Sequence, residues 1–167
     1  AQNTLPDFSY LEPAFFPQSL DLSELTDYHP PESVYAGEGF VKDIFETLSS
    51  NPEVWANTLF IITFDEHGGT YDHLMPPNNA VPPDTNTNPD FDFKRYGVRI
   101  PTLLISPWVT PGTIFRAGYY PEVTNQTQLP FDHTSVLATL CKWKGINYQN
   151  KQQYPNNYLG DRTAVAP

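Results

Sequence analysis

One short apolar run constrains the fold most, because it ends abruptly in charge. Thr58 to Phe64 (TLFIITF) is rich in β-branched and aromatic residues, and Asp65-Glu66-His67-Gly68-Gly69 follows it directly. A continuous apolar run of this length predicts a strand buried on both faces of a sheet. The paired glycines let the backbone turn sharply after it. The sequence therefore predicts a buried strand with two acids and a histidine at its carboxyl end.

The other expected elements alternate between strand and helix. They are a strand over 5–11, a helix between His29 and Asn51, a second buried strand over 102–105, and a helix that follows Phe131 and runs to Lys144. Asp132 or Thr134 is available as the N-terminal cap of the last helix, and Gly145 suits its C-terminal cap. This alternation predicts an α/β fold, with a mostly parallel sheet flanked by helices. At 167 residues, one domain over 1–167 is expected.

A polar excursion separates the two central strands. Residues 76–97 are rich in proline, asparagine and aspartate and contain no sustained apolar period. This composition predicts a long surface loop.

Two interpretations of Asp65-Glu66-His67 stay open on spacing alone. In a parallel sheet, ligands bind beyond the carboxyl ends of the strands. Adjacent carboxylates repel each other, so a hard divalent metal held by Asp65 and Glu66 would explain them, with His67 as a further ligand, proton carrier or phosphate contact. The alternative is a solvated turn that merely follows a strand.

The other histidines give weaker signals. His29 precedes a helix start, where a neutral imidazole beside a bound phosphate is plausible, but a plain surface position is as well. His133 also precedes a helix, and there a capping role is the simpler interpretation. Asp72-His73 either continues the site or forms a local turn in which Asp72 bonds His73 or the backbone.

Charge and motifs exclude several classes of function. The formal charge is −10 and Lys94-Arg95 is the largest basic patch, which argues against nucleic acid as a partner. An acidic protein can still act on phosphate groups when a metal reverses the local sign. No apolar run approaches the ~20 residues of a membrane span. A single glycosylation sequon at Asn125 points to a secreted or cell-surface protein.

Taken together, four sequence blocks resemble one family. They are "HPP" followed by "GEGFV", "WANTLFIITFDEHGGTYDH", "GVRIPTLLISPWV" and "FDHTSVL", and the resemblance as a whole spans roughly Leu5 to Gly145. These blocks resemble the phosphoesterase family of acid phosphatases and phosphocholine-type phospholipases C. The resemblance implies the C-terminal half of an alkaline-phosphatase-like α/β domain and a divalent metal cofactor. Its substrates would be phosphate esters or phospholipid head groups.

The resemblance also implies roles for individual residues. Asp65 and Glu66 match the two adjacent acids that bind the metal in the family. His29 and His67 match histidines around the phosphate, and His133 resembles a late histidine that related enzymes bring to the same pocket.

One departure from the family pattern matters for activity. The family's first half carries a Glu-Asn metal-binding motif and a Ser or Thr nucleophile, and no Glu-Asn dipeptide occurs in this sequence. Without a nucleophile in line with the leaving group, we expect this chain alone to be inactive. A second polypeptide or the missing half would then complete the fold. The alternative is a non-enzymatic structural or assembly protein derived from the same fold.

Overall fold

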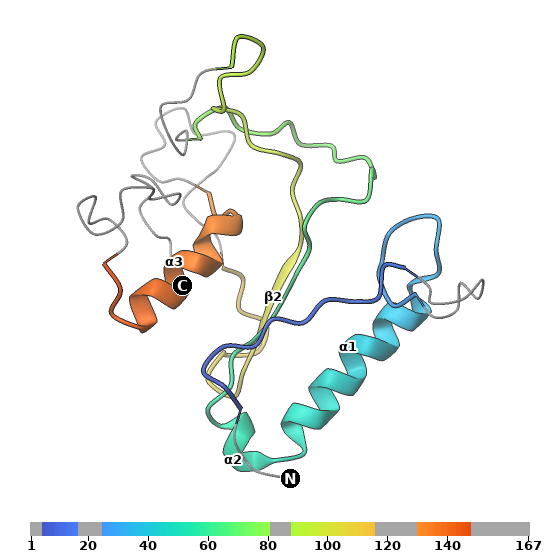
Figure 1. The fold of residues 1–167 in the computed structure, drawn as a ribbon, viewed down its shortest axis with the longest axis vertical. Helices are drawn as coiled ribbons and strands as arrows, with labels where there is room; N and C mark the ends of the chain where they lie inside the picture. The colour runs from blue at the N-terminus through green and yellow to red at the C-terminus, as the bar shows by residue number, and fades with distance from the viewer. Residues whose placement is uncertain (1–4, 17–24, 81–87, 116–129, 148–167) are drawn as a thin grey trace. The chain divides into compact units, whose positions relative to one another are not determined.

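The chain groups into two units. In the computed structural model, the described residues are 5–16, 25–80, 88–115 and 130–147 (Figure 1). The first unit comprises residues 1–71 and 100–113, and the second comprises residues 72–99 and 114–167. The expectation of one domain stays a prediction. None of the helices in the described ranges has the length and apolarity needed to cross a membrane.

The predicted helix after His29 is confirmed as α1, Val34–Ser49. Its N-cap is Ser33, whose side chain accepts a hydrogen bond from the backbone N–H of Tyr35. This bond satisfies one of the donors that a helix start leaves without an internal partner.

A second, short helix follows where the sequence predicted only a stop. It is α2, Pro52–Trp55, and Asn51 caps it by accepting hydrogen bonds from two backbone N–H groups. The Trp55 ring then packs edge-to-face on Phe45 of α1, with ring centroids 5.5 Å apart. Asn51 and Pro52 therefore end one helix and begin the next.

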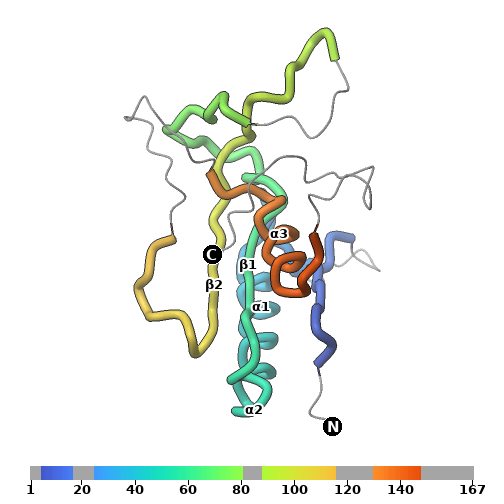
Figure 2. The backbone as a smooth tube through the Cα atoms, turned by 90° about the vertical axis from the view of Figure 1, so that its left-hand side faces the viewer, coloured from blue at the N-terminus to red at the C-terminus, as the bar shows by residue number. Residues whose placement is uncertain are grey.

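The central apolar run forms β1, Phe60–Thr63, and the predicted second strand forms β2, Thr102–Ile105. The two strands lie side by side and run antiparallel, with Phe60 opposite Ile105 and Thr63 opposite Thr102 (Figure 2). The hydroxyls of Thr63 and Thr102 lie 2.8 Å apart and close this end of the pair.

The expectation of parallel pairing is therefore wrong for β1 and β2. Parallel neighbours need a crossover that carries the chain back to the starting end, usually through a helix. The described residues between Thr63 and Thr102 contain no helix. Thr102 instead begins β2 at the end where β1 stops. Helices and strands are both present, and no described pair of strands is parallel.

Two further expectations about strands do not hold. Residues 5–11 form no strand, although they alternate in polarity, because no neighbouring strand offers them backbone partners among the described residues. β1 is half-buried rather than buried on both faces, and Leu103 of β2 is 55% exposed. Within the described ranges, the buried apolar residues are Ala80 and Ala138. Most large apolar side chains therefore retain exposed surface.

In the second unit, backbone hydrogen bonds join the beginning of the predicted surface loop to its end. The Ala80 N–H donates to the Lys94 carbonyl at 2.8 Å, and the Tyr96 N–H donates to the Pro77 carbonyl at 3.0 Å. The described residues of 76–97 form no helix and no strand beyond one isolated bridge, and the surface loop stays a prediction.

The last predicted helix is confirmed as α3, His133–Trp143. Asp132 is its N-cap and forms a capping box with Ser135, which decides between the two caps that the sequence allowed. Gly145 follows the C-cap Lys144 with φ of +66°, as a helix-terminating glycine should.

Candidate active site

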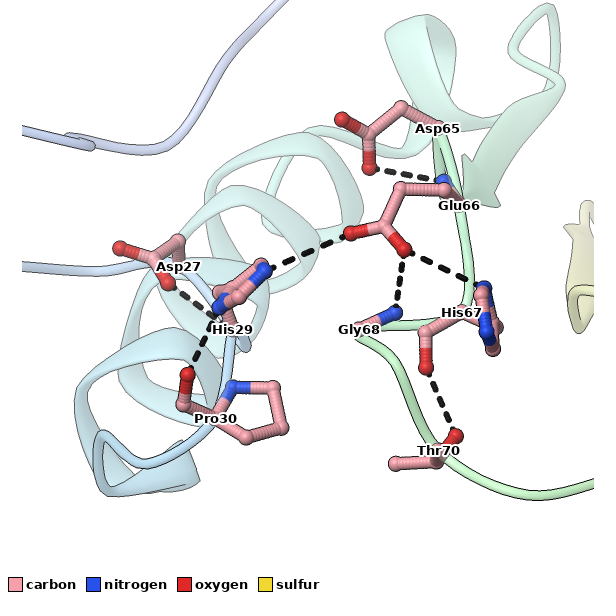
Figure 3. Close-up of polar contacts among 8 residues, drawn as sticks. All are labelled: Asp27, His29, Pro30, Asp65, Glu66, His67, Gly68 and Thr70. Atoms are coloured by element: carbon pink, nitrogen blue, oxygen red, sulfur yellow. Dashed lines mark hydrogen bonds and ion pairs between the residues drawn. The ribbon is translucent and has the colours of Figure 1, made fainter.

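The acids that follow β1 turn back on their own backbone. The Asp65 carboxylate accepts a hydrogen bond from the Glu66 N–H at 2.9 Å. The Glu66 carboxylate accepts one from the Gly68 N–H at 2.7 Å (Figure 3). Backbone donors therefore compensate part of the charge that two adjacent carboxylates concentrate here.

Two imidazoles from separate segments meet the Glu66 carboxylate. His29 Nε2 lies 3.5 Å from one carboxylate oxygen, and His67 Nδ1 lies 3.3 Å from the other (Figure 3). The side chain of His29 is 64% exposed and that of His67 is 32% exposed. The first unit thus brings three of the predicted site residues together and leaves both imidazoles accessible to a ligand.

The backbone around His29 fixes where its ring lies. The buried Asp27 carboxylate accepts a hydrogen bond from the His29 N–H at 2.7 Å. The His29 Nδ1 atom lies 2.7 Å from the Pro30 carbonyl oxygen. Because a carbonyl can only accept, Nδ1 must carry the proton in this contact, and Nε2 is the nitrogen that faces Glu66.

The paired glycines turn the chain as predicted. Gly68 and Gly69 have φ of +65° and +74°, a region that favours glycine. A Cβ on Gly68 would lie 2.8 Å from Pro30 Cδ, so the turn also passes close to the His29 segment. Absence of a side chain at Gly68 therefore permits both the turn and the approach.

Replacing Gly68 by alanine tests this reading. A left-handed conformation costs a non-glycine residue about 1–2 kcal/mol, and the contact with Pro30 adds to that cost. We expect Gly68→Ala to lower the free energy of unfolding by about 2 kcal/mol in urea titrations. The matched control is Gly39→Ala, where the new Cβ meets nothing within 4 Å. Equal effects of the two substitutions would contradict the prediction.

Asp72 forms the local turn that was one of the two predicted alternatives, and it has a further partner. Its carboxylate accepts two hydrogen bonds from the Arg99 guanidinium, at 2.7 and 2.8 Å, and one from the Leu74 N–H at 3.0 Å. His73 Nδ1 is 3.6 Å away. The local turn was foreseen, but Arg99 was missed, because nothing in the spacing of the sequence links it to Asp72.

His133 is the first residue of α3, in the second unit. The side chain that caps this helix is Asp132, so His133 is not needed as the cap. Its place beside the phosphate stays a prediction.

A family model described as the phosphoesterase family matches residues 1–147. The chain belongs to the phosphoesterase family. Non-specific phospholipase C1 of Arabidopsis thaliana is 44% identical over 142 residues, which are 83% of this phosphoesterase chain and 25% of the relative. Non-specific phospholipase C6 of the same plant is 40% identical over an alignment of 172 positions, which covers 99% of the chain and 30% of the relative.

Bacterial relatives match as well. The hemolytic phospholipase C of Pseudomonas aeruginosa is 32% identical over an alignment of 177 positions, which covers 98% of this phosphoesterase chain and 21% of the relative. The chain therefore spans between a fifth and a third of the length of these curated relatives.

The metal that the resemblance implies needs more ligands than two acids. Among the residues that the structure describes, no three His, Cys, Asp or Glu side chains gather as a possible metal-binding group. Carboxylate and imidazole donors suit a divalent ion, but such ions take at least four ligands. The described part of this phosphoesterase chain therefore does not complete a metal site by itself.

Proposed function

We propose that this chain is part of a metal-dependent phosphoesterase that hydrolyses phosphate monoesters or phospholipid-type phosphodiesters. The observation that carries the proposal is the Glu66 carboxylate, which two imidazoles from separate segments approach within 3.5 Å. Membership of the phosphoesterase family supports it, as do the plant and bacterial relatives that are named phospholipases C.

In this proposal, Asp65 and Glu66 supply two carboxylate ligands to a divalent metal, and the remaining ligands lie outside the described residues. A bound divalent ion would neutralise charge on the phosphoryl group.

Each imidazole has a role that its ring nitrogens allow. Because the Nδ1–H of His29 is engaged by the Pro30 carbonyl, this ring donates from Nε2 in its doubly protonated form. A ring N–H of His67, or Nε2–H of the His29 imidazolium, donates to anionic phosphoryl oxygens or passes a proton to the leaving group. The exposure of both rings supports access by a substrate. His133 is proposed as a third histidine in the same pocket. The attacking hydroxyl comes from a Ser or Thr outside this chain.

We further propose that the remainder of an alkaline-phosphatase-like domain, or a second polypeptide, packs on this chain. Large apolar side chains with exposed surface support this, among them Leu103 on β2 and Trp108 just after it. The chain alone should then lack turnover, because the proposed nucleophile and the other proposed metal ligands would come from that partner. Secretion or display at the cell surface is proposed from the sequon at Asn125, which lies outside the described residues.

Turnover and metal binding test the proposal together. Hydrolysis of p-nitrophenyl phosphate and p-nitrophenyl phosphorylcholine is measured for this chain and for the complete phosphoesterase that contains it, with a chelator and with Mg²⁺, Ca²⁺, Mn²⁺ or Zn²⁺. We expect turnover only in the complete protein with metal, and we expect Asp65→Ala to abolish both turnover and calorimetric metal binding.

Turnover that resists both the chelator and Asp65→Ala would overturn the metal role. If the complete protein shows neither turnover nor metal uptake, the proposal that it is an enzyme is overturned. Stable assembly of the chain with other subunits would then favour the structural alternative, which the exposed apolar side chains also permit.

A further inference from the structure

One aromatic side chain connects α1 to the end of β1. The ring of Tyr28 meets the ring of Phe64 edge-to-face, with centroids 5.5 Å apart and an interplanar angle of 85°. Phe64 is the residue that directly precedes Asp65. Tyr28 directly precedes His29, so this contact links the two segments whose side chains meet at Glu66.

The same ring rests on a helix position that has no side chain. A Cβ on Gly37 would lie 2.6 and 2.8 Å from two atoms of the Tyr28 ring, closer than any real contact allows. One residue further along α1, the Glu38 carboxylate accepts a hydrogen bond from the Tyr28 hydroxyl at 2.9 Å. Tyr28 therefore lies on α1 with both its ring and its hydroxyl engaged.

Three successive residues, 28–30, each contact a residue in the segment that follows β1. Tyr28 meets Phe64, His29 meets Glu66, and Pro30 meets Gly68. The His29 contact is the weakest of these, because its ring is mostly exposed and 3.5 Å from the carboxylate. The other polar contact of this ring, from Nδ1 to the Pro30 carbonyl at 2.7 Å, lies within the same segment and does not hold that segment against Glu66. The packing of Tyr28 and Pro30, on either side of His29, must therefore determine how close its ring lies to Glu66.

We infer that Tyr28 is a positioning residue, which holds His29 within reach of Glu66 by packing between Gly37 and Phe64. The inference rests on the proposed function, since it assigns Tyr28 to the placement of a phosphate-contacting histidine. Tyr28 itself touches no reacting atom. Burial, and then the hydrogen bond with Glu38, raise the pKa of Tyr28 to about 12. At neutral pH its hydroxyl therefore keeps the proton that it donates to Glu38.

The test compares the two imidazole contacts of Glu66. In the full 167-residue chain, nuclear Overhauser contacts from the His29 and His67 rings to the Glu66 side chain are measured by isotope-edited NMR. In Tyr28→Leu we expect the His29 contact to be lost and the His67 contact to remain, because His67 is tied to Glu66 through adjacent backbone. Tyr28→Phe keeps the ring and should keep both contacts.

Matched controls separate positioning from general stability. Tyr35→Leu removes an 86%-exposed tyrosine of α1 and should change neither contact. A loss of both contacts in Tyr28→Leu, or retention of both, would overturn the inference.

If Tyr28→Leu loses the helical circular dichroism signal, Phe64→Leu replaces it, because it removes the opposite ring and leaves Tyr28 on Gly37. Selective loss of the His29 contact again supports the inference. Unfolding of both variants would overturn it, because Tyr28 would then be a stability residue.

Kinetics in the complete phosphoesterase give the functional readout. We expect Tyr28→Leu to lower kcat by about 100-fold, as for a catalytic group displaced by ~1 Å, with KM little changed and Tyr28→Phe near wild type. A fall in kcat no larger than that of Tyr35→Leu would overturn the assignment. Absence of turnover in the wild type would instead contradict the proposed function, and the NMR contacts would still decide whether Tyr28 holds His29.

Discussion

Replacement of Glu66 by glutamine is expected to reduce kcat/KM of the complete phosphoesterase by about a thousandfold. A metal that polarises a phosphoryl oxygen contributes several kcal/mol to the transition state, and each 1.4 kcal/mol is a factor of ten. Glutamine retains an oxygen that can accept from the Gly68 N–H, so the turn after β1 is preserved. The lost property is the charge that faces His29, His67 and the proposed metal.

Calorimetric titration with a divalent metal measures the same change without turnover. We expect the dissociation constant of the metal to rise by at least about 100-fold in Glu66→Gln. The control is Glu53→Gln on α2, which removes an acid from the same unit but away from this cluster. Activity and affinity within about twofold of wild type in Glu66→Gln would contradict the role of Glu66.

Replacement of Arg99 by glutamine is expected to raise the pKa of Asp72 toward its ordinary value of about 3.9, with the remaining Leu74 N–H still holding it below that value. The two hydrogen bonds from Arg99, and then the Leu74 N–H, hold the pKa of this carboxyl far below that value. A depressed pKa in the folded state stabilises the fold at pH values above the unfolded pKa. This stabilisation declines as pH falls through the folded pKa.

The pH dependence of unfolding follows from that sign. Arg99→Gln should lower the urea midpoint at pH 7, and the difference from wild type should shrink progressively below about pH 4. The ¹³C NMR shift of the Asp72 side-chain carboxyl measures this titration directly. The control is Lys42→Gln, which removes an exposed ion pair with Glu46 on α1 and should leave the urea midpoint close to that of the wild type at every pH. A pH-independent effect of Arg99→Gln would contradict the assignment.

Local sequence signals predicted the elements of this fold well. The helical spacing after His29, the apolar run before Asp65, the strand over 102–105 and the caps of α3 were all readable, because each depends on residues close together in the chain. The same holds for the turn at Gly68 and Gly69, whose positive φ is a local property.

The pairing of the strands and the packing of the elements could not be predicted in the same way. The antiparallel direction of β2 depends on the path of the residues between the strands, which composition does not specify. The expected strand over 5–11 failed because alternation supplies one face of a strand but not a neighbour to bond it.

In the candidate site, too, residues close together in the sequence were predicted and contacts between distant residues were not. Asp65, Glu66 and His67 are contiguous and stood out by sequence, whereas the approach of His29 needed α1 and Tyr28 in place. Arg99 escaped notice entirely, since its partner Asp72 lies 27 residues earlier and no period connects them.

The antiparallel pairing of β1 and β2 has a consequence for how this region can diversify. Because Thr63 and Thr102 are opposite each other, the intervening chain leaves and rejoins the sheet at one end. For such an excursion, doubling the length costs only about 0.6 kcal/mol of closure entropy. Insertions or deletions beyond the Asp72–Arg99 pair can therefore reshape this loop while β1, its partner strand and the acids that follow stay in register.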